Sequence, residues 1–133
     1  MKSEELKMEK KDIVERSVVY ALRVIRLSRE LENDHAGRVL GKQLLRSGTS
    51  IGANVHEAQG AQSKADFISK MSIAHKEARE SAYWLRLIGN TQIVSTSEVA
   101  SVLDETQQLI KILSSILLTS KANSAKREAI LHS

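Results

Sequence analysis

The stretch LLRSGTSIGANVHEA, residues 44–58, reads as one continuous α-helix although it contains two glycines. Apolar or small side chains recur through it every three or four positions, at Leu44, Ser47, Ile51, Val55 and Ala58. This spacing places them on one face of a helix, where they can be buried together. Leu40 extends the same face toward the N-terminus, so we predict a helix over residues 36–59.

The two glycines of this helix, Gly48 and Gly52, lie four residues apart and share a face. Each costs a helix interior about 1 kcal/mol relative to alanine. A face of small residues lets a second helix approach closely, and the dispersion attraction between the two helices can offset that cost. We predict that the partner is a helix over residues 63–89, which offers its own small residues at Ala74, Ala78, Ser81 and Ala82.

A loop that cradles a ligand is the alternative interpretation of these glycines. The sequence contains neither the phosphate-binding pattern GxxxxGK[ST] nor a GxGxxG turn that follows a strand. Both patterns work by presenting backbone N–H groups to phosphate at the start of a helix. Their absence, together with the helical spacing, favours packing over ligand binding.

The same kind of spacing predicts three further helices, over about residues 12–33, 63–89 and 96–121. Residues that cap helix N-termini stand at their starts: Asp12 with Glu15, Ser63 with Asp66, and Ser95 with Glu98. The chain has no proline and no long linker, so residues 1–133 are predicted to form a single domain. We expect an all-α, antiparallel up-and-down four-helix bundle with frayed termini.

Composition limits the possible functions of the chain. It has 133 residues, a net charge of +4 and no cysteine, which excludes disulfides, thiolate metal sites and cysteine nucleophiles. No apolar run approaches the ~20 residues that span a membrane. The charged N-terminus lacks the apolar core of a secretory signal. These features predict a cytoplasmic protein without membrane association.

Polar residues follow helical spacing on two of the predicted helices. One set lies at four-, four- and three-residue intervals: Arg46, Ser50, Asn54 and Glu57. The other set lies at three- and four-residue intervals: Glu77, Glu80 and Trp84. If the two faces meet, Arg46 can pair with a carboxylate of the other helix, and buried polar groups require such partners. We interpret both sets as a structural network or subunit interface that fixes helix register, and the alternative is a recognition site.

Basic residues form two further stripes. Arg16, Arg23 and Arg26 lie on the first predicted helix, and Arg38 and Lys42 lie one turn apart on the second. Pointing outward, they can neutralise phosphates of RNA or DNA in a salt-dependent way, whereas the alternative is that they only keep the surface solvated. The few aromatic residues argue against sequence-specific reading of single strands by base stacking.

Catalytic and metal-binding patterns are absent from the sequence. Di-iron helical bundles need Glu-x-x-His, which does not occur, and the close pair His56 and Glu57 points to different helix faces. No serine stands beside an activating base in a pattern that indicates nucleophilic catalysis. We therefore predict a protein that is not an enzyme and has no metal or cofactor.

Residues 44–88, LLRSGTSIGANVHEAQGAQSKADFISKMSIAHKEARESAYWLRLI, resemble a family of bacterial four-helix-bundle proteins, the S23 or 23S rRNA intervening-sequence proteins. The resemblance rests on Arg46-Ser-x-x-Ser-Ile-x-x-Asn54, on Glu57, on a Ser-x-x-Asp-Phe helix start, and on Glu77-x-x-Glu-x-x-x-Trp-Leu85. With the helices upstream and downstream, it extends over nearly the whole chain.

This resemblance implies an up-and-down four-helix bundle that associates as ring-like pentamers. Some family members are encoded within insertions in 23S rRNA genes. A distant relative, the accessory protein of diversity-generating retroelements, binds nucleic acid and a reverse transcriptase. We therefore predict a small homo-oligomer that binds RNA or DNA weakly and electrostatically through basic faces of the first two helices. The alternative is a scaffold that binds an unknown protein partner and no nucleic acid.

Overall fold

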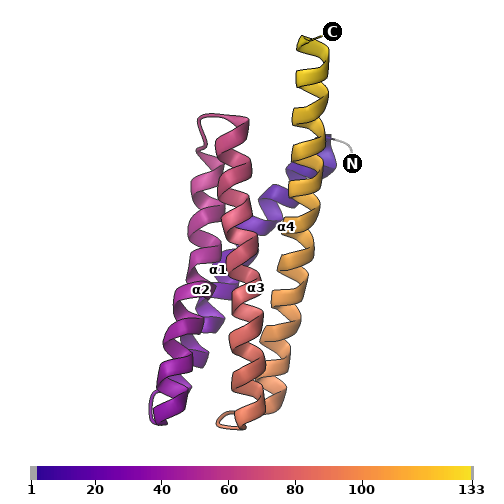
Figure 1. The fold of residues 1–133 in the computed structure, drawn as a ribbon. Helices are drawn as coiled ribbons and strands as arrows, with labels where there is room; N and C mark the ends of the chain where they lie inside the picture. The colour runs from indigo at the N-terminus through magenta and orange to yellow at the C-terminus, as the bar shows by residue number, and fades with distance from the viewer. Residues whose placement is uncertain (1–2, 133) are drawn as a thin grey trace.

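A computed structural model describes residues 3–132 of the chain, with side chains from Ile13 onward. Four α-helices account for most of these residues (Figure 1). They are α1 (Ser3–Glu30), α2 (His35–Gln59), α3 (Lys64–Thr91) and α4 (Thr96–Leu131). Short turns join consecutive helices.

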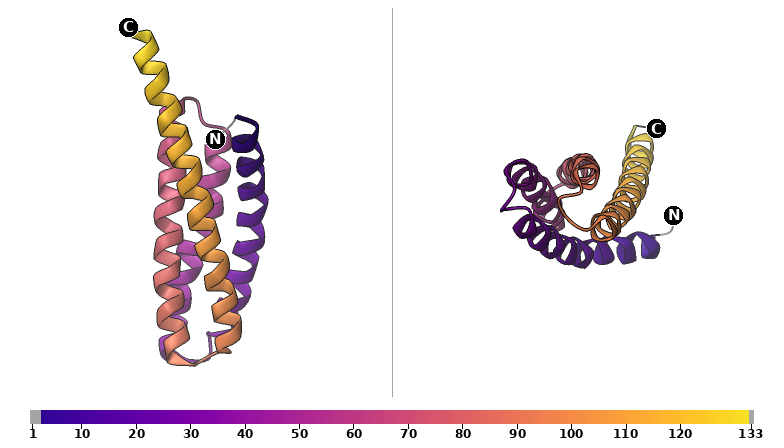
Figure 2. Two further views of the ribbon diagram at one scale, coloured as in Figure 1. Left: turned by 90° about the vertical axis from the view of Figure 1, so that its right-hand side faces the viewer. Right: turned by 90° about the horizontal axis from the view of Figure 1, so that it is seen from below.

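The helices form an antiparallel up-and-down bundle, as the sequence predicts (Figures 1 and 2). Each helix contacts the next one along the chain, and α4 contacts α1 to complete the circuit. Within the described residues, the backbones of the diagonal pairs do not approach one another. This arrangement is the one that short connections between long helices favour. The C-terminal part of α4 projects beyond the turn between α2 and α3 (Figure 1).

Side-chain caps begin two of the helices. An Asp34 carboxylate oxygen accepts a hydrogen bond from the Gly37 N–H at 2.8 Å, and the Ser63 hydroxyl accepts one from the Asp66 N–H at 3.0 Å. Each bond satisfies an N–H group that has no partner within the helix. The predicted cap at Ser95 is wrong in its detail. Helix α4 does begin beside it, but the Ser95 side chain makes no capping bond and lies 2.9 Å from the Ser97 hydroxyl.

The ends of the bundle differ from the sequence prediction. Helix α1 begins at Ser3 and passes through Asp12, so the predicted start at residue 12 is wrong, and it ends at Glu30 rather than 33. Helix α4 continues to Leu131 instead of ending near residue 121. The segments expected to fray therefore continue the helices, and residues 1, 2 and 133 lie outside the described part. The sequence outside residues 12–121 carries little apolar periodicity, which is why pattern alone stops too early at both ends.

The bundle core is mainly aliphatic, in keeping with the few aromatic residues of the chain. Its largest fully buried side chains come from all four helices and include Leu27, Leu44, Ile51, Met71, Leu85, Leu109 and Ile116. Trp84 is only partly buried and packs at the margin of this core. Burial of such side chains contributes about 1.5–3 kcal/mol each, which makes the core the main source of stability.

One buried hydroxyl from each helix meets inside this apolar core. Tyr20 of α1 donates to Thr106 of α4 at 2.7 Å, because the Thr106 hydroxyl donates in turn to the Val102 carbonyl. Ser81 of α3 and Ser47 of α2 hydrogen-bond at 2.8 Å. We call these four residues, all fully buried, the hydroxyl junction. Because an unpaired buried hydroxyl is costly, the junction favours the one helix register that pairs them all.

The glycines of α2 pack against α1, so the predicted packing of Gly48 and Gly52 against α3 is wrong. A Cβ atom on Gly48 would lie 2.9 Å from a methyl of Val24, and one on Gly52 would lie 3.2 Å from the Ser17 hydroxyl. Gly41 continues the row, because a Cβ atom on it would lie 3.5 Å from the Leu31 side chain. We call Gly41, Gly48 and Gly52 the glycine seam. The small residues of α3 are buried as well, and one of them, Ser81, contacts α2 at Ser47 rather than at the glycines.

Replacing Gly48 with alanine tests the glycine seam. Overpacking against Val24 costs about 1–3 kcal/mol and the helix-propensity gain returns about 1, so we expect a net loss of up to about 2 kcal/mol in urea unfolding. The matched control is Gly60→Ala, because a Cβ there meets only a carbonyl oxygen at 3.8 Å. Adding Val24→Ala to the Gly48→Ala protein should restore part of the lost stability. A Gly48→Ala protein as stable as the Gly60→Ala protein would contradict tight α1–α2 packing.

Alkaline pH tests the hydroxyl junction through Tyr20. Burial raises the pKa of the Tyr20 phenol to about 12, against 10.0 for the unperturbed group, while hydrogen bonds with Thr106 and Ser81 act in the opposite direction. Between these values the unfolded chain loses the proton and the folded chain keeps it, so the unfolding free energy falls as pH rises. This contribution amounts to about 2–3 kcal/mol.

The Tyr20→Phe variant should be about 1 kcal/mol less stable than the parent below pH 10. Near pH 12 the gap should close or reverse, because the variant lacks the ionising phenol. Chemical unfolding of both proteins across this pH range gives the comparison. Parallel pH profiles for the two proteins would show that Tyr20 is not held neutral by the core.

Candidate nucleic-acid interface

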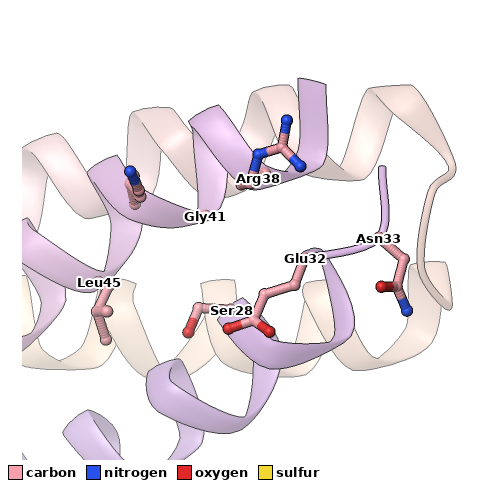
Figure 3. Close-up of a pocket in the computed structure, with 7 residues that line it drawn as sticks. Ser28, Glu32, Asn33, Arg38, Gly41 and Leu45 are labelled. Atoms are coloured by element: carbon pink, nitrogen blue, oxygen red, sulfur yellow. The ribbon is translucent and has the colours of Figure 1, made fainter. Parts of the chain in front are cut away.

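A pocket of about 310 Å³ lies where α1 ends and α2 begins (Figure 3). Its lining comes from both helices and the turn between them: Ser28, Glu32, Asn33, Arg38, Gly41, Lys42 and Leu45. Two of these residues, Arg38 and Lys42, are on the basic stripe predicted for the second helix. The pocket therefore joins part of the predicted phosphate-binding surface to polar groups of α1.

Local sequence explains how these side chains come together. The Asp34 cap starts α2 directly after the turn, so Arg38 and Lys42 fall one helical turn apart on its outer face. Gly41 lies between them along the chain and sits 3.7 Å, measured from an ideal Cβ, from the Ser28 backbone. A Cβ atom at this position would make ordinary van der Waals contact with α1, so there is no room for a longer side chain pointing the same way. The glycine seam thus brings Ser28 of α1, and Glu32 of the turn after it, beside the cations of α2.

The charged side chains that line the pocket do not neutralise one another. Arg38, Lys42 and Glu32 are exposed, and none of them forms an ion pair within the described part of the chain. The Arg38 guanidinium instead approaches the His35 ring nitrogen Nδ1 at 3.4 Å. Two cations one turn apart with no carboxylate partner raise the local positive potential, which attracts anions.

The structure separates the other predicted basic residues from this surface. Arg16 turns toward α4, where it pairs with Glu105 at 2.6 Å and donates to Gln108 at 2.8 Å. Arg23 also donates to α4, to the Ser101 hydroxyl at 2.8 Å. Arg26 is exposed on the outer face of α1. Arg16 and Arg23 therefore join α1 to α4, so of the five predicted residues Arg26, Arg38 and Lys42 remain directed to solvent.

The polar faces of α2 and α3 meet through Arg46. Its guanidinium contacts Glu77 at 3.2 Å and also pairs with Glu80, and the Trp84 indole N–H donates to Glu80 at 3.1 Å. The Glu77 side chain is 12% exposed, whereas that of Arg46 is 50% exposed. The four residues form a network at the edge of the core within a single chain.

The remaining polar residues of that prediction do not join the network. The Ser50 hydroxyl donates to the Arg46 carbonyl at 2.6 Å, and the Asn54 amide donates to the Ser50 carbonyl at 2.9 Å. Both side chains therefore satisfy the backbone of their own helix. Glu57 is exposed and pairs with Lys70 of α3 at 3.1 Å. Helical spacing predicted that these residues share one face of α2. It could not show which of them form polar contacts with α3.

Sequence reasoning missed the α1 side of the pocket. Ser28, Glu32 and Asn33 lie at the end of a helix and in a turn, where polar residues are ordinary and carry no pattern. Gly41 was the available signal, because it stands on the same helix face as Gly48 and extends the glycine row toward the turn.

A second pocket, of about 320 Å³, lies between α3 and α4 beside Arg86 and Asn90.

Two other kinds of site are absent from the residues that the structure describes. No group of three or more His, Cys, Asp or Glu side chains is placed there to hold a metal ion. No described helix combines the length and the apolar character needed to cross a bilayer.

Comparison with known proteins places the chain in a family. Residues 9–115 match the family model described as 23S rRNA-intervening sequence protein. A solved structure from Bacteroides thetaiotaomicron VPI-5482, a protein with unknown function from the S23 ribosomal protein family, is 43% identical with a TM-score of 0.75. That match covers 79% of this chain and 97% of the other. A search of curated proteins finds no match. The chain belongs to the 23S rRNA-intervening sequence protein family.

Proposed function

We propose that this protein binds nucleic acid, weakly and electrostatically, through the surface around the α1–α2 turn. The observation that carries the proposal is the position of Arg38 and Lys42 at the rim of a pocket, without an ion-pair partner among the described residues. Arg26, on α1, is exposed as well and is the third cation of this surface. Such cations release counterions when they meet phosphates, which makes the binding salt-dependent.

RNA is the favoured ligand. The matched family takes its description from an intervening sequence of 23S rRNA, and the solved relative is assigned to an S23 ribosomal protein family. These descriptions concern the relatives, and they support RNA over DNA for this chain. Two or three phosphate contacts in one chain give low affinity, so useful binding requires several chains to act together.

We propose that the chain forms a homo-oligomer, with a pentamer favoured by the family likeness. Three apolar side chains on the outer face of α1 support assembly: Val18 is 47% exposed, Val19 57% and Leu22 49%. An apolar group of this kind on a single chain is a common feature of subunit interfaces. Five chains with a charge of +4 each would carry roughly +20, which multiplies a mild attraction for phosphate.

The protein is proposed to act by binding and not by catalysis, without a metal or other cofactor and in the cytoplasm. Several hydroxyls that could serve as nucleophiles donate to backbone carbonyls of their own helix, as Ser17, Ser28 and Ser50 do. A hydroxyl held this way is not activated by a neighbouring base. Burial and the nearby Arg79 and Lys121 lower the pKa of His75, so its ring is neutral near pH 7. A neutral His75 adds no positive charge to the proposed surface.

A protein-interaction scaffold is the second candidate. The same apolar residues of α1 favour it, because they fit a heterologous protein as well as a second copy. The two candidates differ in what remains after nuclease treatment of an affinity purification from cells. A protein partner that survives this treatment favours the scaffold, whereas loss of all bound material favours nucleic-acid binding.

Reversing the charge at the pocket tests the proposal. We expect Arg38→Glu with Lys42→Glu to abolish binding of a labelled structured RNA at low salt. In the parent, each phosphate contact contributes about 0.7–0.9 to the slope of log affinity against log salt. Fluorescence anisotropy across a salt series gives both quantities.

The matched control is Lys126→Glu with Arg127→Glu, which changes the charge equally at the exposed end of α4. Its affinity should fall by much less than that of the pocket variant. Equal losses in the two variants would show that only overall charge matters. Unchanged affinity in the pocket variant would place the binding surface elsewhere.

A further inference from the structure

We infer that the pocket between α1 and α2 accepts one unpaired guanine nucleotide of an RNA strand, with its phosphate at Arg38 and Lys42 and its base edge at Glu32. The inference deepens the proposed function and rests on it. Its starting observation is that the pocket carries charges of both signs, with Arg38 on α2 and Glu32 in the turn that follows α1 (Figure 3).

The carboxylate is the group that a purely electrostatic surface does not explain. Glu32 weakens attraction for phosphate, yet it lines the same pocket as Arg38 and Lys42. It forms no ion pair with either cation within the described residues, so both signs stay available to a ligand. A ligand that satisfies them together has an anionic end and an end rich in hydrogen-bond donors. A nucleotide has this character.

The size and lining of the pocket suit one nucleotide. Its volume of about 310 Å³ is that of a small-ligand site, at the lower end of the usual range. The pocket is a half-open notch at the end of the bundle, so a strand can enter and leave it. Leu45 supplies an apolar contact for the base, in place of the aromatic ring that many single-strand binders use.

The chemistry of the carboxylate selects among the bases. An ionised carboxylate only accepts hydrogen bonds, through two oxygens side by side. The Watson–Crick edge of guanine presents two adjacent donors, N1–H and the N2 amino group, which match both oxygens. Uracil presents one donor between two carbonyls, which repel a carboxylate. Glu32, which points toward Ser28 in Figure 3, therefore favours guanine over uracil.

The test compares two fluorescein-labelled oligoribonucleotides, AAGAA and AAUAA, by anisotropy at fixed low salt with the full chain. Because one bidentate pair gives about five- to hundredfold discrimination, we expect roughly tenfold tighter binding of AAGAA. Glu32→Gln should abolish this preference, since an amide offers one donor and one acceptor, which can pair with uracil and with guanine alike. The control Glu30→Gln removes the same charge outside the pocket and should keep the preference.

Each outcome separates this inference from the proposed function. Equal binding of the two probes by the parent would overturn base selection, while loss of both probes in the Arg38→Glu, Lys42→Glu variant would still support electrostatic binding. Identical effects of Glu32→Gln and Glu30→Gln would assign Glu32 a charge effect only, which also overturns base selection. Failure of the parent to bind either probe at low salt would overturn both. Thermal unfolding of each variant verifies that the bundle is intact.

Discussion

The close approach of α1 and α2 is the constraint on which the rest of this bundle depends. Gly41, Gly48 and Gly52 have no side chains, so α1 can lie directly against the backbone of α2, with Val24 and Ser17 filling the space. Dispersion attraction across this close interface offsets the conformational cost of glycine in a helix. At the turn, the same approach places Ser28 and Glu32 opposite Arg38 and Lys42, which creates the pocket.

Polar contacts then fix how the remaining helices sit on this pair. The hydroxyl junction joins all four helices within the core, through Tyr20, Ser47, Ser81 and Thr106. Outside the core, Arg16 ties α1 to α4 and Arg46 ties α2 to α3. Aliphatic packing alone tolerates sliding between helices, whereas these hydrogen bonds are satisfied in one register. Because Arg16 and Arg23 contact α4, only Arg26, Arg38 and Lys42 of the five predicted cations remain for a ligand.

Helical spacing predicted the fold because four amphipathic helices with short turns have few ways to bury their apolar faces. It also predicted a polar contact between Arg46 and a carboxylate of α3, since each of the two polar sets lies on a single face of its helix. It could not assign the partner of Gly48, because a wide buried face touches two neighbours and both offer small residues. Nor could it find the partner of Arg16, which lies 89 residues away at Glu105, or the pocket, whose α1 residues follow no period.

The central claim is that the α1–α2 turn is the surface that binds nucleic acid. Backbone NMR of the assembled protein during titration with the AAGAA oligoribonucleotide tests it most directly. The account predicts saturable amide shifts concentrated at Ser28, Glu32, Asn33, Arg38 and Lys42, weakening as salt rises. Shifts confined to α3 and α4, around the second pocket beside Arg86, would contradict it, as would an unchanged spectrum at saturating RNA.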